Sequence, residues 1–357
     1  MSKSTLQDLL GLRLPVIQAP MAGSQGSALA LAVTNAGGLG SLPAATLTPD
    51  ALRDELDILR REAQGPWNVN FFCHQPPQAD AQREALWRAA LAPLCAEAGL
   101  PAPEGPAIAA RAPFDAAAAD LLEAFRPPVV SFHFGLPAPE LLARVKSWGT
   151  KVLSSATTVE EALWLQAHGA DAIIAQGLEA GGHRGLFLGD DLTTQLGTFA
   201  LLPRIVRAVE LPVIAAGGIA DAAGVAAARA LGAAGVQVGT AYLLCPEART
   251  SAPHRAALQS ARARHTALTN VFTGRPARGI VNRAMRVLGA DGSLGGCISR
   301  QAPAFPLAAT HLAPLRAWAE AQGRDDFTPR WAGQAAALAR EMPAADLTLA
   351  LAESWCG

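Results

Sequence analysis

Apolar residues in this chain cluster in short runs, and each run is followed by Gly, Pro or Ser and then by an Ala- and Leu-rich stretch with helical spacing. Runs that stay apolar, without alternating polar residues, are typical of parallel strands covered on both faces. The pattern predicts eight strands, at residues 16–21, 38–42, 67–72, 129–134, 151–155, 172–176, 213–216 and 236–239. It predicts helices at residues 27–35, 49–62, 79–98, 139–148, 159–168, 201–209 and 222–231.

Strands that alternate with helices can all run parallel through right-handed crossovers. Eight such units can close a (β/α)8, or TIM, barrel. An open doubly wound sheet would have fewer units and would carry its glycine fingerprint after the first strand, whereas the glycine-rich turns of this chain come late. We therefore predict an α/β fold of the TIM-barrel class.

The regular alternation stops after the eighth predicted strand. Residues 245–310 include a turn-rich patch at 289–296, and the tail at 312–351 regains helical spacing, interrupted at Trp331, Gly333 and Gln334. We expect residues 1–244 and 311–357 to form the barrel, and residues 245–310 to form a small inserted α/β domain or lid. Two connections are long: an Ala- and Pro-rich one at 95–128, and a Gly-rich one at 177–197 that follows a strand at the catalytic face.

Composition narrows the class of protein. Hydrophobic residues make up 50% of the chain and charged residues 17%, which predicts a compact fold. The net charge is -1, and the basic cluster at 275–283 lacks interleaved aromatic residues, so we expect no nucleic-acid partner. Residues 1–10 lack the pattern of a signal peptide and later apolar runs are interrupted, which predicts a cytoplasmic protein without a membrane span. The five cysteines form no Cys-x-x-Cys pair and are expected to be free thiols.

Glycines follow the last two predicted strands, where TIM barrels bind phosphate. Gly217 and Gly218 end strand seven and open a helix, and residues 237–240 end strand eight. Without a Cβ, the backbone N–H groups of Gly217, Gly218 and Gly239 can approach phosphate oxygens, and Thr240 can add a hydroxyl donor. A tight turn alone is the simpler explanation for either site, but two sites on adjacent strands favour phosphate.

Other strand ends offer groups for a flat aromatic cofactor. Ala19, Pro20 and Met21 place small residues and a thioether at the end of strand one. Asn70 is the better placed of two same-face asparagines in strand three. Gln176 ends strand six and can both donate and accept, as a flavin pyrimidine edge requires, although a structural amide is an equal possibility.

A histidine in the 177–197 connection is the strongest catalytic candidate. His183 lies among small residues, and an imidazole can bind an anion or move a proton near neutral pH. His133 ends strand four between phenylalanines and is a second candidate, for substrate binding. Glu179 and Arg184 flank this histidine within the loop and are interpreted as solvated charges. The histidines form no local metal-ligand pattern, so no metal is predicted.

Taken in order, these segments resemble the nitronate monooxygenase family, formerly called 2-nitropropane dioxygenases, which are FMN-dependent barrels. The matching segments are residues 18–23, 68–70, 177–185, 216–219, 237–240 and 273–279, with 331–334 near the end. The early segments are shared with flavin enoyl reductases, whereas the Gly-Arg-Pro-Ala-Arg stretch at 274–278 is more specific. Inosine monophosphate dehydrogenase-like chemistry would need a cysteine in the 177–197 loop, which has none.

The resemblance implies a site as well as a fold. It implies that His183 faces the substrate above the flavin ring, and that the flavin contacts come from Asn70, Gln176, Gly181, Gly218, Gln237, Val238, Gly239 and Thr240. To these expected cofactor contacts we add Ala19, Pro20, Met21, Gly182 and Gly217.

The expected activity is FMN-dependent oxidation of alkyl nitronates, such as propionate 3-nitronate, by O2 to a carbonyl compound and nitrite. His183 would stabilise the nitronate oxygens, or would remove the α-proton of a neutral nitroalkane if its pKa is near 6.5. The alternatives are an NAD(P)H-dependent flavin reductase of enoyl thioesters or quinones, a non-catalytic flavin-binding barrel, and a flavin-free phosphosugar isomerase. The expected partners are small molecules, and the expected assembly is a monomer or a homodimer.

Overall fold

The chain folds around a barrel of parallel strands. The computed structural model describes residues 5–78, 80–108, 111–289 and 297–356. Eight parallel strands lie in the order β1-β9-β8-β6-β5-β4-β3-β2. They are β1 (Val16–Gln18), β2 (Gly40–Pro43), β3 (Trp67–Phe72), β4 (Val129–His133), β5 (Lys151–Ala156), β6 (Ala172–Gln176), β8 (Val213–Ala216) and β9 (Gly235–Val238). The predicted TIM barrel is confirmed, and every predicted strand is present with small shifts of its ends.

Strand β1 meets β2 and closes the barrel. Leu39 N donates to Val16 O at 2.9 Å and Gln18 N donates to Leu39 O at 3.0 Å. Inside the ring, side chains of alternate positions pack with no exposed surface, among them Ile17, Leu153 and Ile214. The short helix α1 (Leu6–Leu10), which was not predicted, contributes to the same cluster. The barrel is thus filled by side chains, as the fold requires.

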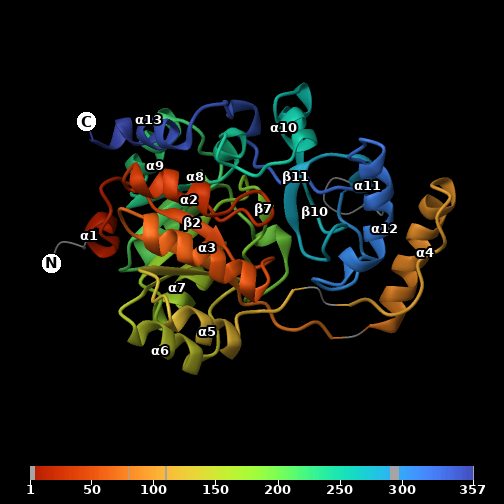
Figure 1. Cartoon of the computed structure of the whole chain (residues 1–357), viewed down its shortest axis with the longest axis horizontal. Helices are drawn as coiled ribbons and strands as arrows, with labels where there is room; N and C mark the ends of the chain where they lie inside the picture. Colours follow the sequence, from red (N-terminus) through yellow and green to blue (C-terminus); the bar gives the residue numbers. More distant parts are fainter. Residues whose placement is uncertain (1–4, 79, 109–110, 290–296, 357) are drawn as a thin grey trace.

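Helices surround the barrel (Figure 1). They are α2 (Ser27–Asn35), α3 (Pro49–Glu62), α5 (Ala116–Glu123), α6 (Pro139–Ser147), α7 (Val159–Ala167), α8 (Thr198–Ala208), α9 (Ala222–Ala230) and α13 (Ala344–Cys356). Several begin at a side chain that accepts a first-turn N–H, as Thr48, Asp115, Thr158 and Asp221 do. The C-terminal helix α13 contacts both α9 and α2, so the tail packs back on the barrel and completes the ring of helices.

One predicted barrel helix lies elsewhere. Helix α4 (Ala81–Glu97) corresponds to the prediction for 79–98, whose first residue is outside the described ranges. Its Trp87, Leu91 and Leu94 pack against α12 (Ala308–Ala321) and α11 (Arg283–Leu288), not against the barrel. The barrel position between β3 and β4 is taken by α5, which lies in the long Ala- and Pro-rich connection at 95–128, where no helix was predicted.

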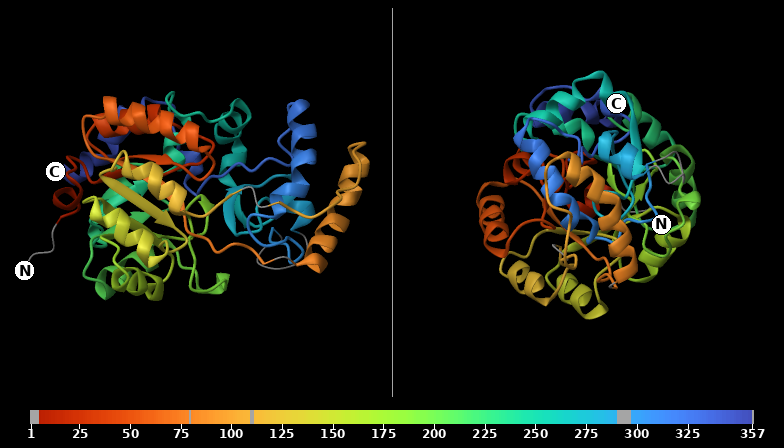
Figure 2. Two further views of the ribbon diagram at one scale, coloured as in Figure 1. Left: turned by 60° about the horizontal axis from the view of Figure 1, so that its bottom comes forward. Right: turned by 90° about the vertical axis from the view of Figure 1, so that its right-hand side faces the viewer.

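The second unit, made of α4, α11, α12 and the strands β10 (Thr266–Thr269) and β11 (Ala277–Ile280), lies beyond one end of the barrel, and both chain termini lie at the other (Figures 1 and 2). Strand β11 pairs antiparallel with β10 and with β7 (Gly182–His183), so the loop after β6 joins the sheet of this unit. The boundaries at 245 and 310 stay a prediction, although the shared core of α4 and α12 favours a unit built from two chain segments.

The remaining regular segments connect these two parts. They are α10 (Ala252–Leu258) and the 3-10 turns η1 (Leu192–Thr194), η2 (Thr240–Leu244), η3 (Ala261–Arg264) and η4 (Ala336–Leu338). Residues 290–296 of the predicted turn-rich patch lie outside the described ranges. Within those ranges, no helix has the length and apolar character that crossing a bilayer requires.

Candidate active site

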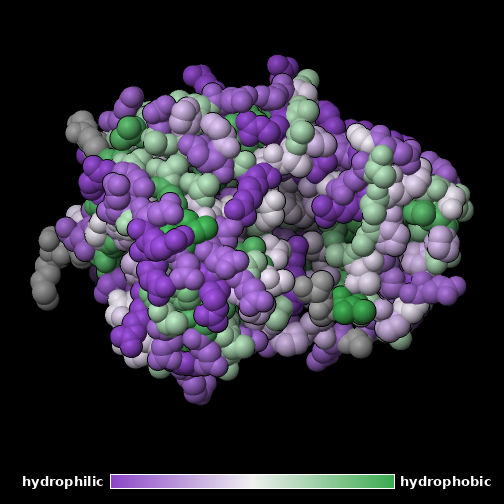
Figure 3. Space-filling view, viewed as in Figure 1, coloured by the Kyte–Doolittle hydropathy of each residue, from purple (hydrophilic) through white to green (hydrophobic). Residues whose placement is uncertain are grey.

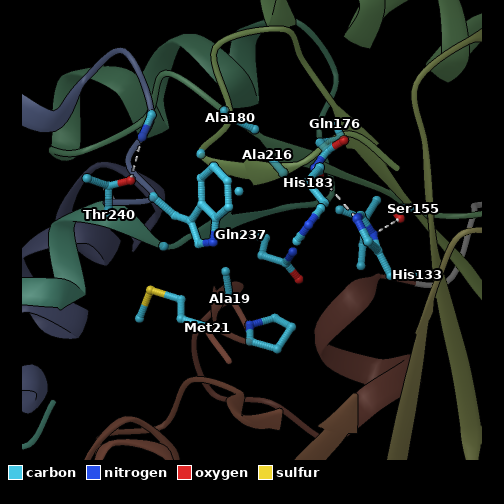
Figure 4. Close-up of a pocket in the computed structure, with 18 of the residues that line it drawn as sticks. Ala19, Met21, His133, Ser155, Gln176, Ala180, His183, Ala216, Gln237 and Thr240 are labelled. Atoms are coloured by element: carbon cyan, nitrogen blue, oxygen red, sulfur yellow. Dashed lines mark hydrogen bonds between the residues drawn. The ribbon is translucent and has the colours of Figure 1, made fainter. Parts of the chain in front are cut away.

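A pocket opens at the carboxyl ends of the barrel strands, and the molecular surface is hollowed between the barrel and the second unit (Figure 3). Nearly all the predicted site residues line this pocket: Ala19, Pro20, Met21, Asn70, His133, Gln176, Gly181, Gly182, His183, Gly217, Gly218, Gln237, Gly239 and Thr240. Thr240 and the pair of His133 and Ser155 lie at opposite sides of it, with Gln237 between them (Figure 4).

Val238 is the exception among the predicted residues. Its side chain is 1% exposed and packs in the barrel core, because alternation along β9 turns it away from the pocket. Its carbonyl accepts a hydrogen bond from Ala19 N at 2.8 Å. The geometry therefore gives Val238 no contact with the pocket, unlike its neighbours Gln237 and Gly239.

The glycine turns after β8 and β9 leave backbone at the pocket wall. Gly217 and Gly218 have φ values of 115° and 76°, which L side chains rarely adopt. A Cβ on Gly217 would lie 3.0 Å from Ala180 N, and one on Gly239 would lie 3.3 Å from the Cβ of Ala19. Helix α9 begins just beyond the first turn, so its N-terminus adds to the positive potential there.

Thr240 keeps a donor available beside these turns. Gly333 N donates to Thr240 Oγ1 at 2.9 Å, which leaves the hydroxyl proton free to bind a ligand oxygen. Gly333 comes from the segment predicted to interrupt the helical tail. That segment therefore closes one side of the pocket.

Glu179 supports the first glycine turn. Its carboxylate accepts from Thr198 N at 2.8 Å, at the start of α8, and Thr198 Oγ1 lies 2.9 Å from both Glu179 Oε2 and Gly217 O. The interpretation of Glu179 as a solvated charge is wrong, since the side chain is half-buried and caps a helix. The sequence holds no local signal for this contact, because the partner is a distant helix start.

Arg184 was also misinterpreted as solvated and is fully buried. It donates to Gly177 O at 2.7 Å, to Gln176 O at 2.8 Å, and to Gln195 Oε1 at 3.0 and 3.1 Å. Burial lowers the pKa of the guanidinium to about 10, although Glu179 and Glu161 partly oppose this shift. The residue therefore fixes the turn that leads from β6 to β7.

The amide of Gln176 also supports this loop. Its Nε2 donates to His183 O at 2.9 Å, and its Oε1 accepts from Gly185 N at 2.8 Å. These bonds match the structural role that the sequence left open beside a flavin contact. One Nε2 proton remains for a ligand.

Two further amides face the pocket. Asn70 is 5% exposed, and its Nδ2 donates to the carbonyl and hydroxyl oxygens of Ser131. Gln237 Oε1 is buried without a hydrogen-bond partner. A buried acceptor that nothing satisfies is costly, so this atom indicates that a bound group supplies a donor here.

His183 lies on β7 among aromatic rings. Its Nε2 is 3.0 Å from Thr273 Oγ1, and its ring centroid is 5.4 Å from that of Phe305 and 5.5 Å from that of Trp331. Burial, and then the charge of Arg111 and other nearby cations, lower the pKa of His183 well below its usual range. The imidazole is therefore neutral at physiological pH, in contrast to the unperturbed value assumed from the sequence.

His133 is hydrogen-bonded at both ring nitrogens. Nε2 lies 3.2 Å from His183 O, which can only accept, so Nε2 carries the proton. Nδ1 then accepts from Ser155 Oγ at 2.5 Å. Burial, followed by the charge of Arg275, lowers the pKa of His133 to about 3. His133 therefore holds the His183 backbone as well as lining the pocket.

The pocket carries positive charge in the region of these histidines. Arg111 lines the wall, and the Cζ atom of Arg275 lies 3.9 Å from the centroid of Phe134. Within the part of the chain that the structure describes, no group of three His, Cys, Asp or Glu side chains could hold a metal ion. Neutral imidazoles with neighbouring guanidinium groups are suited to binding a small anion.

Comparison with known proteins identifies the family of the chain. The model of the nitronate monooxygenase family matches residues 3–354. Nitronate monooxygenases of Paraburkholderia phytofirmans and Pseudomonas aeruginosa are 45% and 44% identical to the chain. Both alignments span 98% of this chain, and they span 94% and 98% of the two relatives.

Solved structures show the same relationship. Nitroalkane oxidase from Streptomyces ansochromogenes is similar with a TM-score of 0.86 and 39% identity, over 99% of this chain and 98% of that one. FabK from Thermotoga maritima is similar with a TM-score of 0.72 and 27% identity, over 99% and 97% of the two chains. The chain belongs to the nitronate monooxygenase family of flavin-dependent oxidoreductases.

Proposed function

We propose that this chain binds FMN in the pocket and oxidises alkyl nitronates with O2 to a carbonyl compound and nitrite. Membership of the family supports nitronate oxidation. One observation supports FMN binding and the chemistry at His183: the pocket has glycine turns at the ends of β8 and β9 and a neutral histidine across from them.

The residues present suit FMN. Gly217, Gly218 and Gly239 leave room for phosphate oxygens against the backbone, and Thr240 adds its hydroxyl. The unsatisfied Gln237 Oε1 would accept from a ring N–H group. Asn70 and the small residues from Ala19 to Met21 would line the ring, and Gln176, Gly181 and Gly182 would contact it from the β6 side.

The cofactor supplies the electron transfer from the nitronate and the reaction with dioxygen when bound, and the protein supplies binding and orientation. Neutral His183 would hydrogen-bond a nitronate oxygen, and the adjacent cations would favour the anion over a neutral nitroalkane. A base whose pKa is well below 6.5 is poorly matched to removing a weakly acidic carbon-bound proton. We therefore infer that the nitronate is the bound form and that His183 acts as a hydrogen-bond donor.

The first test identifies the cofactor and the reaction. We expect the purified protein to be yellow, to release FMN on denaturation, and to consume O2 and form nitrite with propionate 3-nitronate. Rapid bleaching by NADH, with no nitronate oxidation, would favour the reductase alternative. Colourless protein that takes up no FMN would contradict the proposal.

The second test concerns His183. His183→Asn is expected to keep its FMN and to lose about 10- to 100-fold in kcat/KM, since a hydrogen bond to a charged group is lost. His168→Asn is the matched control, because His168 is exposed at the C-terminal end of α7 and its ring Nδ1 lies 2.7 Å from Trp164 O. Full activity in His183→Asn would remove His183 from the mechanism.

A further inference from the structure

A guanidinium lies on the pocket wall beside β3. Phe114 N donates to Phe72 O at 2.8 Å, so the segment that carries Arg111 runs past the end of this strand. Arg111 is half-buried and lines the pocket together with Phe72, His133 and His183.

Arg111 and His183 lie against the same aromatic ring. The Arg111 Cζ atom is 5.8 Å from the Phe305 centroid, and the centroid of the His183 ring is 5.4 Å from it. Of all charged side chains, Arg111 acts most strongly on the pKa of His183. The two groups can therefore contact opposite ends of one small molecule.

The charge of Arg111 is not compensated within the described residues. None of their carboxylates forms an ion pair with it, and the charge that acts on the pKa of Arg111, that of Arg316, is also positive and lowers it further. Glu179, the acid on the pocket wall, is bound to Thr198 near the glycine turns. A partly desolvated guanidinium without a counterion has much to gain from a bound anion.

A buried histidine next to Arg111 has few polar partners. His74 is 5% exposed, its ring centroid lies 4.8 Å from that of Phe305, and it lies beside the Arg111 backbone. Neither of its ring nitrogens makes a hydrogen bond of normal geometry. His74 does not line the pocket, so it lies behind the wall, and Arg111 is the group on this side that a bound molecule can reach.

We propose that Arg111 binds a carboxylate at the end of the substrate remote from the nitronate group, and thereby makes this chain selective for carboxylate-bearing nitronates over simple alkyl nitronates. The inference rests on the proposed function and deepens it. A planar guanidinium can bind both oxygens of a carboxylate, whereas the nitronate would bind at His183. Arg111 is then a specificity-determining residue, not a participant in electron transfer.

The test compares two substrates that differ in that one group. Propionate 3-nitronate carries a carboxylate where propyl 1-nitronate carries a methyl group. For Arg111→Gln we expect KM for propionate 3-nitronate to rise about 10- to 100-fold with little change in kcat, and KM for propyl 1-nitronate to change less than about threefold. Arg111→Lys should restore part of the difference, because lysine keeps the charge but not the planar pair of donors.

Arg316→Gln is the matched control. It removes a positive charge that acts on Arg111 from an exposed position on α12, paired with Glu320. If Arg316→Gln shifts the preference between the substrates as much as Arg111→Gln does, long-range charge explains the selectivity and the proposal is wrong. Equal losses for both substrates in Arg111→Gln, with unchanged flavin content and thermal stability, would also overturn it.

A binding measurement separates this inference from the proposed function. If the unmodified protein oxidises neither nitronate, the proposed function fails. Calorimetric titration with 3-nitropropionate and 1-nitropropane then decides the role of Arg111. Tighter binding of 3-nitropropionate than of 1-nitropropane, weakened at least about tenfold for the acid by Arg111→Gln, would support an anion site. Equal binding of 3-nitropropionate by both proteins, or no binding at all, would reject it.

Discussion

The turn after β6 depends on one buried cation, and its removal should be measurable as lost stability. Arg184→Met would leave the carbonyl oxygen of Gln176 and Oε1 of Gln195 without the donors they have now, whereas Gly177 O would keep its hydrogen bond from Ala180 N at 3.1 Å. Each buried acceptor left unpaired costs about 1–3 kcal/mol, which puts the loss from these two acceptors at about 2 kcal/mol or more. Methionine fills much of the volume and needs no desolvation of a charge, so we expect the loss to stay below about 5 kcal/mol.

Urea unfolding followed by circular dichroism would measure this loss, with Arg204→Met as the control. Arg204 is exposed on α8, and its replacement should change the free energy of unfolding by less than about 0.5 kcal/mol. Arg184→Lys should lie between the two, because a single ammonium cannot reach all three acceptors. A loss below about 1 kcal/mol in Arg184→Met would mean that water satisfies these oxygens, and the turn would not depend on Arg184.

Three further outcomes follow from the site. Gly239→Ala should cost little stability, because its φ of -113° is open to alanine and Ala19, whose Cβ would lie 3.3 Å from the new methyl group, needs to shift only slightly. It should weaken FMN binding about tenfold or more in a fluorescence titration, since the methyl group narrows the wall of the proposed site. With preformed nitronate, the plot of kcat/KM against pH should show no ionisation near pH 6.5, because burial keeps His183 neutral. A fall in kcat/KM below pH 6.5 that disappears in His183→Asn would contradict this. Burial lowers the pKa of His133 to about 3 in the folded protein, whereas its pKa in the unfolded chain is about 6.5. The unfolded chain therefore binds the proton first, and the free energy of unfolding should fall as the pH drops below about 6.5. His133→Gln should reduce that slope in thermal unfolding scans between pH 7 and 4.

The barrel was predictable because its signals are local. Each strand is a short apolar run that ends in a turn residue, and the glycine turns at Gly217 and Gly239 lie directly at strand ends. Chain order alone then places them on one face of the barrel. The pocket residues at these ends were found for that reason.

The rest depended on contacts between distant parts of the chain. Helix α4 has a convincing helical pattern, but its apolar face packs on α12, more than 200 residues later, and no local feature could assign it to one part or the other. Helix α5 was missed because it is short and lies in an Ala- and Pro-rich stretch. Glu179 and Arg184 are charged residues in a glycine-rich segment, and no local pattern indicates their hydrogen-bond partners Thr198 and Gln195.

That pairing places His183 on a strand shared by both halves of the molecule. Its neighbours in the ladder belong to β11, while its carbonyl oxygen accepts from Gln176 and His133 of the barrel. Moving the two halves apart would break one of these two sets of bonds. Substrate exchange is therefore expected through the existing mouth of the pocket, with His183 held in place between the two halves.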